Sequence, residues 1–430
     1  MEIRVAGGKS NVVRLNNAAT TPPFVEVVEK VTQCMETYSA VHRGAGPYAE
    51  ETIEEYEIAE RQIARFIETT NDQELLFTEN TTSAINQLTR MLNLTENDAI
   101  LTSGIEHTSN YLPWRFNTKS KITAFKTNAD SSFDLENMYE KIEALQPAIV
   151  SITGCHSLTG YIPPLREIAR KVHKNGGKLF VDCAQLAPHR PLRLKENDID
   201  YAAFSGHKMY APFGTGVLAV RKELLEGQPA NLGGGTIDML SNQVIWAKGT
   251  KKHQAGTPNV MGVIALGESM KVMKKIGWNN LINHENKLTN ALVQEVNSIP
   301  KVKTYVPMEK YKENRTGVLA FNVNGLHPAL VSAILDKEYR IETRNGTICS
   351  HRLVRKWLAV SDREQRRVES EIMKGNLLAS YGIVRASIGV HNTEDDIEKL
   401  VSAVKQISAK GPQQYYVPAP SEETYKVLRP

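Results

Sequence analysis

Short apolar runs rich in β-branched residues alternate with stretches of helical periodicity between residues 70 and 222. Nearly continuous apolar strands are typical of parallel sheets, because helices cover both faces and bury each strand on both sides. The alternation therefore predicts an α/β fold with a mostly parallel sheet. The seven expected strands are 75–78, 99–103, 121–125, 148–154, 178–182, 201–206 and 215–220, with helices such as 81–92 and 165–177 between them.

A different pattern begins near residue 262. A long helical stretch (about 262–298) leads into strand patterns at 317–323 and 383–389 and helical patterns at 328–338 and 393–408. Because 430 residues exceed what one small core accommodates, we expect two domains. The expected organisation is an N-terminal segment (1–25) packing on the small domain, a large domain (26–280), a smaller α+β domain (281–410) and an irregular C-terminal arm (411–430).

Composition argues against several classes of protein. The net charge is only +4 and no long basic run occurs, so nucleic-acid binding is not expected. No apolar stretch reaches the length of about 18 residues that a membrane span needs, and the N-terminus lacks the apolar segment of a signal peptide. The four cysteines form no CxxC pair, so we expect no metal site and a reducing, cytoplasmic location.

Polar side chains follow the ends of two expected strands. Asp182 ends KLFVD, with Gln185 one turn later, and Lys208 follows the next strand in FSGHKMYAPFGTG. Thr81 and Thr82 begin a helix, where N–H groups and hydroxyls bind phosphate, although a threonine pair there is also typical of an ordinary N-cap. Ligands of open α/β sheets gather at the carboxyl ends of strands. A lysine, a carboxylate and a phosphate-binding helix start together match the requirements of pyridoxal 5′-phosphate (PLP).

Six segments in sequence order resemble the class V, fold-type-I PLP enzymes, and most closely their cysteine desulfurase and selenocysteine lyase-like branch. The resemblance extends over about residues 13–409. It implies a large PLP-binding domain, a smaller α+β domain and a homodimer with shared active sites. The matching segments are LNNAATTPP (15–23), IEHTSNYLPW (105–114), VDCAQ (181–185), FSGHKMYAPFGTG (204–216), HQAGTPNV (253–260) and VRASIGVHNTEDDI (384–397).

The resemblance also implies a role for each matching residue. Lys208 is the expected Schiff-base lysine and proton shuttle, and His107 is expected to stack on the pyridine ring. Asp182 is expected to pair with the pyridine nitrogen, and Arg385 to bind the substrate carboxylate through its planar fork. The remaining implied ligands are Gln185 for the ring hydroxyl, Thr81, Thr82, Ser205 and His207 for the phosphate, and Thr257 for the phosphate across a dimer interface.

Cys349 determines which reaction this set of residues would support. Arg344, Gly346 and Cys349 match the R-x-G-x-x-C spacing of the desulfurase branch. The resemblance implies that Cys349 attacks the sulfur of L-cysteine, leaving L-alanine and a persulfide for an acceptor protein, with Arg344 beside the thiol. The alternatives are another class V reaction on a related amino acid, as in a C–S lyase, a selenocysteine lyase, an epimerase or an aminotransferase. Of these, a C–S lyase, an epimerase or an aminotransferase would not need this cysteine. A small buried cysteine is the plainer interpretation.

Several positions depart from the family pattern. Ser157 stands where the family has an asparagine near the cofactor hydroxyl or substrate, so it is a candidate substrate-binding residue. The cysteine lies in an unusual T-I-C-S-H setting, and 35 residues separate it from Arg385 instead of the family's dozen or so. Within that insertion, Ser361 and Glu364 form a capping-box pattern. We therefore expect an inserted charged helix near 361–374.

Overall fold

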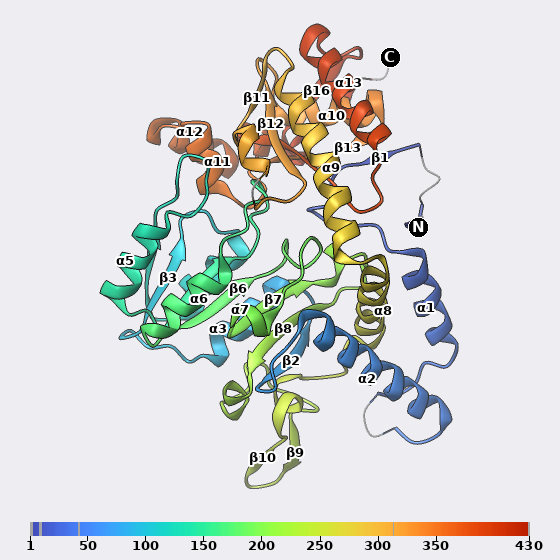
Figure 1. The fold of residues 1–430 in the computed structure, drawn as a ribbon, viewed down its shortest axis with the longest axis vertical. Helices are drawn as coiled ribbons and strands as arrows, with labels where there is room; N and C mark the ends of the chain where they lie inside the picture. Colours follow the sequence, from blue (N-terminus) through green and yellow to red (C-terminus); the bar gives the residue numbers. More distant parts are fainter. Residues whose placement is uncertain (1–2, 8–10, 42–43, 313, 429–430) are drawn as a thin grey trace.

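A seven-stranded mixed sheet forms the centre of the computed structural model, which describes residues 3–7, 11–41, 44–312 and 314–428 (Figure 1). The strand order is β2-β8-β7-β6-β5-β3-β4, and only β8 runs antiparallel to its neighbours. The expected mostly parallel sheet is confirmed. Its strands are β2 (Gln73–Thr78), β3 (Ala99–Ser103), β4 (Lys121–Phe125), β5 (Ile149–Thr153), β6 (Lys178–Asp182), β7 (Tyr201–Ser205) and β8 (Gly216–Arg221).

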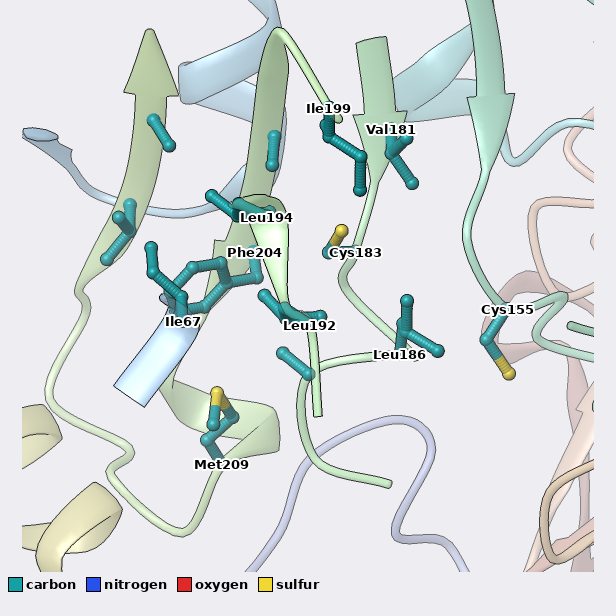
Figure 2. Close-up of a cluster of buried hydrophobic side chains, with 14 of the residues drawn as sticks. Ile67, Cys155, Val181, Cys183, Leu186, Leu192, Leu194, Ile199, Phe204 and Met209 are labelled. Atoms are coloured by element: carbon teal, nitrogen blue, oxygen red, sulfur yellow. The ribbon is translucent and has the colours of Figure 1, made fainter. Parts of the chain in front are cut away.

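Successive strand residues point to two separate hydrophobic cores. Val181 and Phe204 pack in one core with the loop residue Cys183 (Figure 2), whereas Phe180 and Ala203 pack in the other. This is the period-two alternation of a strand that is buried on both faces. The helices that supply the first face are α1 (Val25–Glu36), α2 (Pro47–Ile67), α5 (Leu135–Leu145), α6 (Leu165–Lys174) and α8 (Val260–Ile276), and those of the second face are α3 (Thr81–Met91) and α4 (Leu112–Asn117).

A four-stranded antiparallel sheet forms the framework of the C-terminal region, in the order β11-β12-β15-β14. It shares a hydrophobic core with three helices and with Val13 and Leu15 from the N-terminal segment. Strand β1 (Val13–Arg14) pairs in parallel with β13 (Ile341–Glu342), which ties that segment to this region. The remaining elements are β11 (Val302–Thr304), β12 (Val318–Val323), β14 (Arg344–Gly346), β15 (Ile383–Ser387), α9 (Trp278–Asn297), α10 (Pro328–Tyr339) and α13 (Glu394–Lys410).

Three segments differ in detail from the sequence expectations or extend them. The long helix expected near 262–298 is two helices, α8 and α9, because the chain breaks at Gly277, whose φ of 86° favours glycine. The expected irregular arm is instead an antiparallel hairpin of β16 (Tyr416–Ala419) and β17 (Thr424–Val427). The insertion contains α11 (His351–Trp357) and α12 (Asp362–Met373), where Ser361 accepts a hydrogen bond from the Glu364 N–H.

A second hairpin projects from the large sheet region and exposes apolar side chains. Strands β9 (Ile237–Leu240) and β10 (Val244–Trp246) pair antiparallel at the lower end of the view in Figure 1. Its exposed side chains include Leu240 and Ile245. Among the described residues, none of the helices has the combination of length and apolar character that crossing a bilayer requires.

Candidate active site

A cavity of about 810 Å³ lies at the carboxyl ends of the parallel strands. Asp182 ends β6, and Lys208 closes the 3-10 turn η2 (Gly206–Lys208) that follows β7. Thr153 ends β5, and His107 follows β3. This is the edge where sheet topology gathers ligand-binding residues. The cavity is lined by every residue expected to touch the cofactor or substrate apart from Thr257, namely Thr81, Thr82, His107, Ser157, Asp182, Gln185, Ser205, His207, Lys208, Arg344, Cys349 and Arg385.

Asp182 is buried and Lys208 is half-buried in this cavity, and the two side chains carry opposite charges. Burial lowers the pKa of Lys208 to about 8, while the Asp182 carboxylate opposes that shift and Arg385 adds to it. Burial raises the pKa of Asp182, and a backbone hydrogen bond from Ala184 and the charge of Lys208 work against that rise. Lys208 is therefore available as a neutral amine much closer to neutral pH than an exposed lysine is.

His107 stands at the start of the 3-10 turn η1 (Thr108–Asn110), where its Nδ1 accepts the Ser109 N–H at 3.2 Å. Burial, followed by the charge of Lys208, lowers its pKa to about 3, so its ring is neutral near pH 7. At the end of the turn, Asn110 donates to Glu106 at 2.7 Å and accepts from Trp114 at 3.1 Å. These buried hydrogen bonds hold the turn, and hence the imidazole, in one place.

Hydroxyl groups line the start of α3. The Thr81 N–H donates to the Ser205 Oγ at 2.8 Å, and the two hydroxyls lie 2.6 Å apart. Thr82 Oγ1 lies 2.7 Å from Ser109 Oγ. Asn80 caps the helix by accepting the Ser83 N–H. The N–H groups and hydroxyls of this helix start form the kind of site that binds a phosphate.

Arg385, in β15, contributes a buried guanidinium to the lining of the cavity. The side chain is only 2% exposed, and burial lowers its pKa to about 9. Its NH1 donates to the backbone oxygen of Ser157 at 3.3 Å, whereas its Nε has no hydrogen-bond partner among the residues that the structure describes. Within the same described part of the chain, Ser157 Oγ also lacks a partner. Buried polar atoms of native proteins are usually hydrogen-bonded, so these two indicate a place for a polar ligand.

Cys349 is exposed, and its loop follows β14. Its backbone oxygen accepts the Thr108 N–H at 3.0 Å, which fastens the loop beside His107. Ile348 and Cys349 both have left-handed backbone angles, with φ of 48° and 55°. The plainer interpretation of Cys349 as a buried cysteine is therefore wrong, whereas Cys34, Cys155 and Cys183 are buried.

Comparison with known proteins places this cavity in a family. "Aminotransferase class-V" matches residues 13–400 of the chain. The chain belongs to the class V aminotransferase family. A relative from Synechocystis sp., named a probable cysteine desulfurase, is 32% identical over 92% of this chain and 90% of its own length. The solved cysteine desulfurase of Thermococcus onnurineus NA1 is 28% identical, with a TM-score of 0.83 over 92% of this chain and 94% of its own.

A second solved structure, the cysteine desulfurase CsdA of Escherichia coli, is 28% identical and has a TM-score of 0.80 over 94% of this chain and 96% of its own. Class V members are PLP-dependent enzymes, so PLP is the cofactor of this chain. The donor set fits that group. Asp182 and Lys208 lie in the same cavity, the α3 start presents N–H and hydroxyl groups, and Arg385 and Ser157, which carry polar atoms without hydrogen-bond partners among the described residues, also line it.

Two of the expected cofactor ligands have surroundings that the sequence did not indicate. Thr257 is exposed in the loop before α8 and does not line the cavity of this single chain. Gln185 donates through Nε2 to the Ala18 oxygen at 2.6 Å, which holds the N-terminal segment against the cavity. The neighbours Cys155 and His156 lie in the turn after β5. Cys155 bonds to Thr316, whereas His156 bonds to the Ile105 oxygen.

Sequence reasoning missed some cavity residues. Ser109 and Asn80 line the cavity: the Ser109 hydroxyl contacts the predicted Thr82, and Asn80 caps the helix that begins with Thr81 and Thr82. Ser109 had a visible signal, since it lies two residues after His107 in IEHTSNYLPW. The described residues contain no group of three or more His, Cys, Asp or Glu side chains arranged to hold a metal ion.

Proposed function

We propose that this chain is a PLP-dependent cysteine desulfurase, which converts L-cysteine to L-alanine and leaves a persulfide on Cys349. The observation that carries this proposal is the position of Cys349. It is exposed, and it lines the same cavity as the half-buried Lys208 and the buried Arg385. A thiol, a basic amine and a carboxylate-binding guanidinium around one cavity are what removal of sulfur from an amino acid requires.

The cofactor would be held by residues that enclose it on three sides. Asp182 would pair with the pyridine nitrogen, His107 would stack on the ring, and Gln185 would bond the ring hydroxyl. When bound, PLP supplies an electron sink for the substrate carbons. The neutral imidazole of His107, whose pKa is about 3, adds no positive charge above the ring. The phosphate ligands are Thr81, Thr82, Ser205 and His207, joined by Thr257 from a second subunit.

Arg385 and Lys208 have different roles towards the substrate, carboxylate binding and proton transfer. Arg385 binds the carboxylate, and its unpartnered Nε provides an additional donor for that anion. Arg344, in the neighbouring strand β14, adds positive charge to the same wall. Lys208, with its pKa lowered to about 8, removes the α-proton and returns a proton to the product. Ser157 contacts the substrate through its free hydroxyl.

Cys349 carries the sulfur. Its thiolate attacks the substrate sulfur, so that an S–S bond forms while the C–S bond breaks and its electron pair returns to carbon. Protonation of that carbon gives alanine, and the outer sulfur stays on Cys349 as a persulfide. No external oxidant or reductant is needed for this step.

A protein acceptor and a homodimer complete the proposal. Next to Cys349, Arg352 donates to the Tyr111 hydroxyl at 2.7 Å, and Leu112 and Phe116 are exposed close by in the sequence. Arginine and aromatic side chains are enriched at protein interfaces, which supports docking of an acceptor there. The exposed apolar hairpin β9–β10 supports dimerisation. The free cysteines support action in the reducing cytoplasm.

The decisive experiment measures products from L-cysteine. We expect equal amounts of alanine and sulfane sulfur, and Cys349→Ala should abolish both while leaving cofactor absorbance unchanged. Cys34→Ala, in helix α1 and outside the residues that line the cavity, is the matched control. Pyruvate as the product would instead indicate a C–S lyase. Alanine formation that persists in Cys349→Ala would contradict the proposal.

A further inference from the structure

The C-terminal hairpin lies beyond residue 400, where the family match ends. It is anchored on α10 of its own chain. Glu338 accepts the Gln413 N–H at 3.0 Å and the Tyr416 hydroxyl at 3.1 Å. Tyr425 packs against His327, with ring centroids 5.9 Å apart. The hairpin is therefore a fixed part of the small domain with a defined position for its turn.

The turn of this hairpin reaches the strand that precedes the Cys349 loop. The turn is the 3-10 segment η7 (Pro420–Glu422), which packs against η6 (Leu377–Ala379), and Glu423 follows it with a φ of 54°. Glu423 Oε1 lies 3.2 Å from the point where a Cβ on Gly346 would stand. Gly382 also packs closely against the backbone of Gly346, which leaves Gly346 little freedom to move. The carboxylate of Glu423 thus packs against Gly346, the last residue of β14.

Gly346 is the base of the loop that carries Cys349. Within the loop, the Ser350 N–H donates to the Thr347 oxygen at 2.9 Å, and Thr347 Oγ1 lies 3.4 Å from His351 Nε2. The left-handed angles at Ile348 and Cys349 are costly for residues other than glycine, most of all for a β-branched side chain. Such a conformation persists only where the surrounding structure holds it.

We propose that Glu423 is a positioning residue for Cys349, acting through Gly346 to brace the base of the loop. The inference rests on the proposed function in one respect, since it takes Cys349 to be the sulfur-accepting thiol. The charge of Glu423 also reaches His351, two residues after the cysteine, and raises the pKa of that imidazole against the larger lowering by burial. His351 is consequently neutral at about pH 8, where the brace acts by contact and not by an ion pair.

Alkylation of Cys349 by iodoacetamide in the PLP-loaded protein tests the brace directly. The other three cysteines are buried, so modification reports this thiol, and peptide mass spectrometry verifies the site. Glu423→Ala should speed alkylation about two- to five-fold, as expected for loss of one exposed contact. Glu423→Gln keeps a side-chain oxygen facing Gly346, so this variant should be alkylated at the wild-type rate at about pH 8.

Kinetics with L-cysteine separate positioning from a general loss of structure. In Glu423→Ala, kcat for alanine formation should fall about two- to five-fold, with KM and cofactor absorbance unchanged, because the substrate pocket is intact. Glu422→Ala is the matched control, since the neighbouring carboxylate pairs only with Lys426 within the hairpin among its described contacts.

Three results would overturn the inference. The first is an alkylation rate in Glu423→Ala equal to wild type. The second is an equal acceleration in Glu422→Ala or Glu423→Gln. The third is faster alkylation with an unchanged kcat for alanine. If the wild-type protein forms no alanine, the proposed function fails, while the alkylation rates still decide whether Glu423 braces the loop.

Discussion

The floor of the cavity and the Cys349 loop are two halves of one site with opposite physical character. Asp182 ends the central strand β6 and is buried, and Lys208 is half-buried in the turn that follows the neighbouring strand β7. Cys349 stands on an exposed loop with left-handed backbone angles, held by turns and by contacts to distant segments. Burial gives the floor its shifted pKa values, whereas exposure leaves the Cys349 thiol accessible to the proposed sulfur acceptor. The proposed reaction requires both a rigid part and an accessible part of the site.

Replacement of Lys208 gives the largest effect that this comparison predicts. Lys208→Ala should reduce turnover of L-cysteine at least about 10³-fold, since in the proposed function the amine both anchors the cofactor and transfers the proton. Alanine release and cofactor absorbance are the measurements. Lys222→Ala is the control, because this lysine pairs with Glu74 at the surface. Retention of a protein-bound cofactor band in Lys208→Ala would show that another lysine holds PLP.

Substitution of Arg385 tests whether this side of the cavity binds the substrate carboxylate. Arg385→Gln should lower kcat/KM about 10- to 100-fold, mainly through KM, because a charged hydrogen bond to the carboxylate is lost. Steady-state kinetics with L-cysteine provide the measurement. Arg344→Gln, on the paired strand and exposed, should reduce kcat/KM by less than about five-fold. Equal losses in both variants would mean that Arg385 has no special role.

The lowered pKa of Lys208 predicts how pH controls cofactor loading. Only the neutral amine condenses with PLP, so loading of the apoprotein should accelerate about ten-fold per pH unit at low pH. The rate should level off above about pH 8, where the buried amine is already neutral. Stopped-flow absorbance measures this profile. A rate that continues to rise towards the ordinary lysine pKa of 10.5 would contradict the assigned burial effect.

The two halves also differ in how far the sequence predicts them. The strands from β3 to β7 and the residues at their ends follow from local apolar runs and from sheet topology, which are both visible in the sequence. The brace at Glu423 depends on contact between residues 346 and 423, and no local pattern encodes that approach. The C-terminal hairpin was expected to be irregular because its Pro-rich polar composition gives a weak strand signal. Its pairing becomes favourable only when α10 supplies a surface.

The smallest predicted effect follows from a change in the inserted helix α12. It tests whether the Cys349 loop depends on this helix. Val368 is its only buried residue, and Gln365 accepts a hydrogen bond from the Tyr381 hydroxyl at 2.6 Å. A helix with so little apolar contact depends on its cap. Ser361→Ala removes the acceptor for the Glu364 N–H and should destabilise α12 by about 1 kcal/mol.

Hydrogen exchange of the α12 amides should then accelerate about five-fold, because local opening becomes easier by that amount. Cofactor absorbance and the alkylation rate of Cys349 should stay unchanged, since the loop is fastened through Thr108 and not through α12. Ser370→Ala, an exposed position within the same helix, is the matched control. Faster alkylation of Cys349 in Ser361→Ala would show that the insertion supports the loop, and the exposed half of the site would then extend to α12.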